Sequence, residues 1–216
     1  MEWAVLGLSI LFLIITYIVV QGTRAAMAWR KAAAEGDTKV IRDIVEDAIS
    51  VWSSAKRPKP VPAEVWRGVQ SMQVVEVGPE FVRVSCQAAG DYTLANGRWV
   101  ERSNPLQEGM AITARAADML FYELPHFKAE RIQIDIYTSF RDQSGITQRS
   151  CILSTSPSRA DAAGVDWEEW TAAEIVDVLG GEYRFGDNGQ PLPIEVAPPA
   201  VVEGEDAEIP PAPVER

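Results

Sequence analysis

The pattern of apolar and polar positions changes character along the chain, and its first segment is continuously apolar. From Ala4 to Val20 there is no charged residue, and only Ser9, Thr16 and Tyr17 carry a polar group. As a helix this run is about 26 Å long, and with its flanking residues it approaches the roughly 30 Å hydrocarbon thickness of a bilayer. Backbone groups in lipid must bond within their own segment, so the run predicts a transmembrane helix, with residues 1–24 as the anchor.

The residues that flank this segment predict its orientation. Trp3 and Trp29 lie toward its two ends, where indole rings favour the headgroup level. Arg24, Arg30 and Lys31 follow the segment, whereas the side before it offers only a glutamate and the terminal amine. Because basic residues remain on the cytoplasmic side, we expect a single-pass protein with its N-terminus outside and its soluble domain in the cytoplasm.

A cleaved signal peptide is the main alternative to an anchor. The small residues 25–28 could mimic a cleavage site. A signal peptide, however, has a basic region before its apolar core, and this chain has none there. The anchor is therefore the favoured interpretation, and the lipid bilayer is the first expected partner.

Residues 25–62 are interpreted as a juxtamembrane segment. In residues 38–56 the apolar positions recur at helical spacing, with Lys39, Arg42 and Asp43 off the stripe, and Asp37 is suited to cap this helix. The apolar stripe must pack against something, either its own domain or a second chain. Residues 56–62 (KRPKPVP) then predict a short extended spacer.

The period changes to two from Val65 onward, which indicates strands with one apolar and one polar face. Asn96-Gly97 is a typical two-residue hairpin turn, and Gly78-Pro79 separates another strand pair. The predicted strands are residues 69–77, 81–88, 92–95, 98–102, 132–140 and 146–155.

Two further helices are expected between and after these strands. Asn104-Pro105 opens one that reaches about Leu124, and Asp166 opens another that ends at Gly180-Gly181. Residues 63–194 therefore predict an α+β domain of two layers, a mostly antiparallel sheet with helices on one face. Residues 195–216 hold six acids, one base and several prolines, so a disordered acidic tail is expected.

Composition and charge exclude several classes of function. The chain has 216 residues, 47% of them apolar, and a net charge of −11, which argues against a nucleic-acid partner. Two cysteines and one histidine are too few for a typical zinc site, and the common nucleotide, metalloprotease and hydrolase motifs are missing. No metal and no cofactor are expected.

The isolated reactive side chains do not predict catalysis. His126 follows a helix-ending proline, and Cys86 and Cys151 fall within predicted strands, where a free cysteine acts as an apolar filler. Five acidic residues could in principle form a pair, but all are expected near turns or on solvent faces: Asp91, Glu101, Asp135, Asp142 and Asp187. No catalytic residue is assigned.

Four tryptophans are the more suggestive set, since indoles are common in pockets and interfaces. Trp66, Trp99, Trp167 and Trp170 are candidates for such a site, with core packing as the alternative. We therefore expect an anchored accessory or scaffolding protein that binds a protein partner or associates with itself. An outward-facing ligand sensor and an enzyme without a recognisable motif are the alternatives.

Overall fold

The computed structural model describes residues 2–95, 98–141, 147–187 and 189–196. Side chains are described throughout these ranges except in residues 2–9, 91–95, 98–103 and 141. The predicted turns at Asn96-Gly97 and 142–145, and the predicted tail beyond residue 196, therefore lie outside the described residues.

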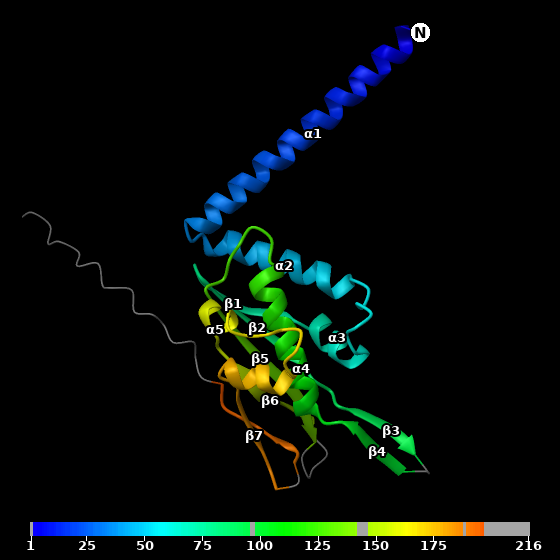
Figure 1. Ribbon diagram of the computed structural model, residues 1–216. Helices are drawn as coiled ribbons and strands as arrows, with labels where there is room; N and C mark the ends of the chain where they lie inside the picture. Colours follow the sequence, from blue (N-terminus) through cyan, green and yellow to red (C-terminus); the bar gives the residue numbers. More distant parts are fainter. Residues whose placement is uncertain (1, 96–97, 142–146, 188, 197–216) are drawn as a thin grey trace, which may run out of the picture.

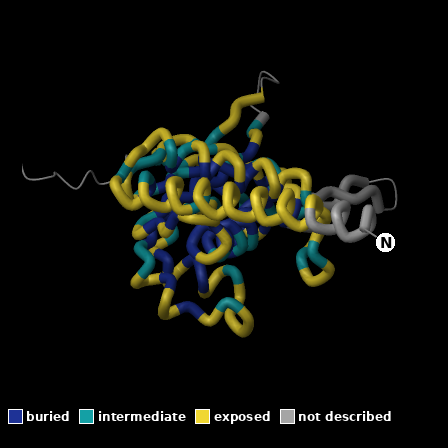
Figure 2. Tube along the Cα trace, turned by 90° about the horizontal axis from the view of Figure 1, so that it is seen from above, coloured by how far each residue is buried: buried dark blue, intermediate teal, exposed yellow. Residues whose placement is uncertain are grey.

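The first element, α1 (Glu2–Ala34), is one uninterrupted helix that stands away from the rest of the molecule (Figure 1). Its large apolar side chains between Ile10 and Val20 are 41–68% exposed, and Figure 2 shows α1 as exposed along most of its described length. Thr16 donates its hydroxyl proton to the Phe12 carbonyl at 2.8 Å, so this hydroxyl is satisfied within the helix. The helix is long and apolar enough to span a membrane.

The second helix, α2 (Thr38–Ser54), turns back from α1 at Gly36, whose φ of +79° suits a residue without a side chain. Asp37 caps it as expected, accepting hydrogen bonds from the backbone N–H groups of Lys39 and Val40 at 3.0 and 3.2 Å. Most of the apolar positions predicted for this helix are buried in the core shared with the sheet, whereas Val51 is 64% exposed. The buried ones are Ile41, Ile44, Val45, Ala48, Ile49 and Trp52. In this chain the stripe packs on its own domain.

Residues 63–70 form a helix, α3 (Ala63–Gln70), so the predicted start of a strand at residue 69 is wrong. The strand β1 (Gln73–Val77) begins four residues later. Val65, Trp66 and Val69 are buried together on one side of α3, which is a helical spacing. Trp66 and Gln70 bond to carbonyls at the end of α2, so α3 also completes that terminus.

The main sheet contains six strands in the order β1-β2-β5-β6-β7-β8. Its members after β1 are β2 (Phe81–Gln87), β5 (Arg131–Arg141), β6 (Thr147–Thr155), β7 (Glu182–Phe185) and β8 (Pro191–Leu192). β2 pairs with β5 in parallel, and the other neighbours in this sheet pair antiparallel. The α+β class is thus confirmed, with a mixed sheet.

The parallel pair exists because the chain crosses over between β2 and β5. The crossover contains the predicted hairpin, β3 (Asp91–Ala95) with β4 (Arg98–Ser103), and then the helix α4 (Pro105–Asp118). Asn104 caps α4 as expected, and Gly109 lets it approach the sheet, because a Cβ there would lie 3.0 Å from Ile136. A π-helical turn, η1 (Met119–Glu123), completes the crossover helix.

Two short helices follow β6, and α4, α5 and α6 lie in front of the sheet in Figure 1. They are α5 (Arg159–Ala162) and α6 (Ala172–Val178). The predicted start of the last helix at Asp166 is wrong, because Thr171 and Glu174 form the capping box and residues 166–170 form a separate turn. Val178, the last residue of α6, is 49% exposed.

Candidate functional site

The four candidate tryptophans occupy three different environments. Trp66 is buried in the core, where its indole N–H donates to the Ala55 carbonyl at 3.3 Å. Trp99 lies in β4, and its side chain is outside the described residues. Trp167 and Trp170 come together on the turn before α6, where Trp167 is half-buried and Trp170 is 38% exposed.

Trp167 and Trp170 form one side of a cavity of about 430 Å³, which we call the tryptophan groove. The spacer before α3, α3 itself, α4 and α6 supply the remainder of the lining. The lining residues are Pro60, Val61, Pro62, Val65, Ala111, Ala114, Arg115, Asp118, Trp167, Trp170, Ala172 and Ile175. The groove is thus apolar along most of its lining and has one charged end.

Local hydrogen bonds hold the aromatic side of the groove in place. The Asp166 carboxylate accepts from the backbone N–H groups of Glu168 and Glu169, both at 3.1 Å. The backbone N–H of Trp170 donates to the Asp166 carbonyl at 3.1 Å, which closes the turn. Tyr122 of η1 meets the Trp167 ring edge-to-face with centroids 6.1 Å apart, an arrangement that aromatic pairs favour. The indoles are therefore positioned by backbone bonds and by one ring contact.

The charged end of the groove lies where α4 passes into η1. Arg115 forms ion pairs with Asp118 and, at 2.8 Å, with Glu123. Burial raises the pKa of the Asp118 carboxyl above its usual value; Arg115 opposes this shift and Glu123 adds to it. Arg115 and Asp118 line the groove, and Glu123 adds a second carboxylate beside them. π-helical turns occur often at functional sites.

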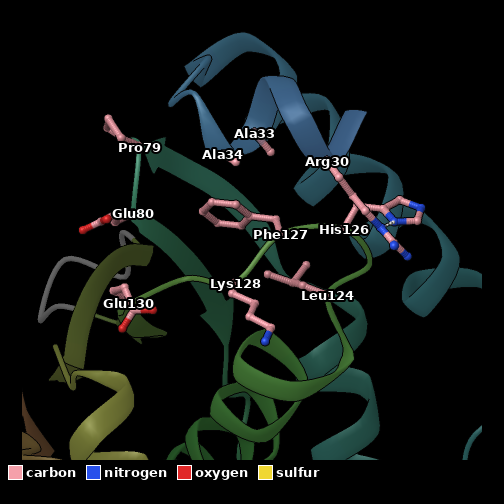
Figure 3. Close-up of a pocket in the computed structure, with 10 residues that line it drawn as sticks. All are labelled: Arg30, Ala33, Ala34, Pro79, Glu80, Leu124, His126, Phe127, Lys128 and Glu130. Atoms are coloured by element: carbon pink, nitrogen blue, oxygen red, sulfur yellow. Dashed lines mark hydrogen bonds between the residues drawn. The ribbon is translucent and has the colours of Figure 1, made fainter. Parts of the chain in front are cut away.

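A second cavity, the corner pocket, lies where the end of α1 meets the domain (Figure 3). Its volume is about 520 Å³, and its lining residues are Arg30, Ala33, Ala34, Pro79, Glu80, Leu124, His126, Phe127, Lys128 and Glu130. The Arg30 Nε donates to the His126 Nδ1 at 3.1 Å, which joins α1 to the loop after η1. Among the described residues other than glycine, His126 is the one with a positive φ, +63°.

The membrane-flanking residues do not all belong to this pocket. Arg30 lines it, while Lys31 lies 3.7 Å from Glu35 in an exposed pair. Trp29 lines a smaller neighbouring cavity, and Arg24 has no ion-pair partner among the described residues. The side chain of Trp3 is outside the described residues.

Asp135 corrects the expectation that all five acidic candidates face solvent. It is 0% exposed and forms an ion pair with Arg83 at 2.8 Å. Ser154 and Gln133 donate to its other oxygen at 2.7 and 3.1 Å. The residue belongs to a hydrogen-bonded polar cluster on the sheet, and no second carboxylate is bonded to it within the described residues.

The other acidic candidates are not brought together. Asp187 is exposed, and Asp142 and the side chains of Asp91 and Glu101 are outside the described residues. Sequence patterns gave no sign that Arg115, Asp118 and Glu123 would meet, because their ion pairs form across the transition from α4 to η1. The one hint in the sequence is that two acids follow Arg115, three and eight residues later.

The two thiols are free and buried. Burial raises the pKa of Cys86 to about 12 and that of Cys151 to about 11, so both remain protonated and unreactive near neutral pH. Across the part of the chain that the structure describes, no three His, Cys, Asp or Glu side chains are grouped to hold a metal ion.

Comparisons of the chain with family models, with curated proteins and with solved structures find no significant match.

Proposed function

We propose that the chain is a single-pass, membrane-anchored accessory or scaffolding protein whose cytoplasmic domain binds a protein partner in the tryptophan groove. The observation that carries the proposal is the groove itself, because one exposed and one half-buried indole line it together with Pro60, Pro62 and apolar residues of α3, α4 and α6. Rigid aromatic side chains at a concave surface are the usual anchors of binding energy at interfaces. In this proposal the helices and the sheet act as a two-layer support for the groove.

The exposed apolar surface of α1 supports the membrane anchor. Among the described residues no other element covers Ile10–Val20, and such a long exposed apolar surface is unfavourable in water. The three bases after it, Arg24, Arg30 and Lys31, favour a cytoplasmic domain.

The chemistry of the groove indicates the kind of partner. An extended apolar segment would contact the apolar lining, and a basic side chain at one end of it would approach Asp118, which pairs with Arg115, with Glu123 beside them outside the lining. A cation there also gains from the neighbouring aromatic faces. A partner peptide with apolar residues followed by lysine or arginine is the expected ligand.

A site-specific photocrosslinking experiment in intact cells tests this function. A photoreactive phenylalanine analogue at position 170 should crosslink the full chain to a partner or to a second copy. Trp167→Ala should reduce that product about tenfold or more, as expected for loss of an anchor residue. The same analogue at Phe185, which is 64% exposed in β7, is the matched control and should give no such product. Equal crosslinking at positions 170 and 185 would contradict the proposed groove.

Sidedness is tested with a single introduced thiol. Ser53→Cys places a thiol on an exposed position of α2, and the two native cysteines are buried and do not compete. A membrane-impermeant maleimide should label it only after the cells are permeabilised. Labelling of intact cells would instead support an outward-facing domain, and release of the protein from membranes by carbonate would contradict the anchor.

A further inference from the structure

The corner pocket has side chains of both charge signs, and they lie on opposite sides of the cavity. Arg30 and His126 are together on one side in Figure 3, Glu80 and Glu130 are on the other, and Lys128 lies between them. With the histidine neutral, two bases and two acids give a net charge of zero. A simple anion would be repelled by the carboxylates and a simple cation by the bases, so the pocket suits a ligand that carries both charges.

These charged groups are available for a ligand. The Lys128 ammonium and the Glu80 carboxylate have no ion-pair partner among the described residues. The Glu130 carboxylate makes one long ion pair, 3.9 Å from the Arg159 Nε. The Arg30 guanidinium uses its Nε on His126 and leaves its terminal nitrogens without a partner in the described part of the chain. A volume of about 520 Å³ is within the range of small-ligand sites.

A mostly apolar cavity of about 320 Å³ adjoins the corner pocket, and His126 lines both. Its other walls include Gly22, Ala26 and Trp29 of α1, together with Ile44 and one carboxylate, Asp47, of α2. These α1 residues come between the apolar run and Arg30, so this cavity lies nearer to the proposed bilayer than the charged pocket does. The two cavities therefore form a path that is apolar on the membrane side and charged on the domain side.

We infer that this path binds one phospholipid with a phosphoethanolamine headgroup. Arg30 and Lys128 bind the phosphate, Glu80 and Glu130 bind the primary ammonium, and the glycerol end lies in the apolar cavity beside Trp29. Carboxylates accept hydrogen bonds from a primary ammonium, which a trimethylammonium cannot donate. The inference rests on the proposed membrane anchoring and does not depend on the tryptophan groove.

The test uses the full chain, purified in detergent from membranes and reconstituted into vesicles of defined composition. The vesicles contain phosphatidylcholine with phosphatidylethanolamine or with phosphatidylglycerol, and lipid retained after gentle detergent extraction is measured by native mass spectrometry. The unmodified chain should retain the ethanolamine lipid in preference to both other lipids. Free phosphoethanolamine at equal concentration should not displace it, because the soluble headgroup lacks the apolar part that fills the second cavity.

Two double variants separate the two halves of the headgroup. Arg30→Gln with Lys128→Gln should lower retention of the ethanolamine lipid about fivefold per base removed, the effect of one basic residue near a lipid surface. Glu80→Gln with Glu130→Gln should abolish the preference for ethanolamine over glycerol headgroups. The control, Lys39→Gln with Arg42→Gln on α2, removes two bases outside the pocket and should leave retention unchanged.

The outcomes are distinguishable from failure of the anchor. A chain that floats with vesicles but shows no headgroup preference, or loses lipid equally in the pocket and control variants, overturns the lipid site and leaves the anchor intact. A chain that does not float overturns both. Displacement by free phosphoethanolamine shows that the ligand is a soluble phosphate compound and contradicts the lipid assignment.

Discussion

The first two helices are consecutive in the chain and have opposite relations to solvent. In α1 the apolar residues surround the helix, and between Ile10 and Val20 they are exposed. In α2 they form one stripe, and that stripe is buried against the sheet and α3. The number of apolar residues therefore does not determine what a helix does. Their distribution around the helix axis does. Apolar residues on one face can be covered by the rest of the protein, whereas apolar residues on all faces need an apolar environment around the whole helix.

The largest expected effect comes from truncating matched isoleucines in the two helices. Ile41→Ala in α2, at a fully buried position, should lower the free energy of unfolding of the domain by about 2–5 kcal/mol. Ile14→Ala in α1 should leave the free energy of unfolding nearly unchanged, since the Ile14 side chain is exposed and does not pack in the core of the domain. Chemical unfolding in detergent, followed by tryptophan fluorescence, measures both. Similar losses in the two variants would contradict the contrast between the helices.

A charge placed on α1 sharpens the comparison in the other direction. Ile14→Arg should disfavour membrane insertion by roughly 2.5–3.5 kcal/mol, the cost of arginine near the centre of a spanning helix. The amount of protein resistant to carbonate extraction should fall accordingly. The unfolding midpoint of the domain should stay the same, and a large drop in that midpoint would show that α1 packs on the domain.

The cap of α2 provides a smaller effect. Asp37→Ala removes the acceptor of two backbone hydrogen bonds and should lower the free energy of unfolding by about 1 kcal/mol. Asp43→Ala, at an exposed position within the same helix, is the control and should be nearly neutral. Equal effects from the two changes would mean that Asp37 acts only through its charge.

The smallest effects belong to the exposed ion pairs of the two helices. Lys31–Glu35 at the end of α1 and Arg42–Glu46 in α2 have the same spacing, at 3.7 and 3.4 Å. Lys31→Gln and Arg42→Gln should each change the free energy of unfolding by less than about 0.5 kcal/mol. An effect of several times this size for Lys31 alone would indicate that the α1 junction contributes more than a solvated pair.

Local signals predicted the parts of the fold that depend on local chemistry. The continuous apolar run, the stripe of α2, the Asp37 and Asn104 caps and the β3–β4 hairpin were all recognisable from neighbouring residues. The errors arose where tertiary contacts decided between alternatives. The segment 63–70 is short and contains Val and Trp, which also favour strands. It forms a helix because Val65, Trp66 and Val69 pack together.

The parallel pairing of β2 with β5 has no local signal, because strands 81–87 and 131–141 are far apart in the chain. The same reason applies to the sites. Trp167 and Trp170 could be chosen as candidates by residue type. That they line one cavity with Pro62 depends on how α3 and α6 pack. The corner pocket was missed entirely, since it joins Arg30 to a loop about a hundred positions later.

The continuity of α1 has a mechanical consequence. Its 33 residues make a rod about 50 Å long, with Ala33 buried at its lower end and Arg30 bonded to His126. A helix inserted in a thinner bilayer accommodates the mismatch by tilting. Because no proline or loop separates the apolar half of α1 from its lower end, such a tilt of a membrane-inserted α1 would be passed to the domain as a rotation and would alter the height of both cavities above the headgroups. The orientation of the domain would thereby depend on bilayer thickness.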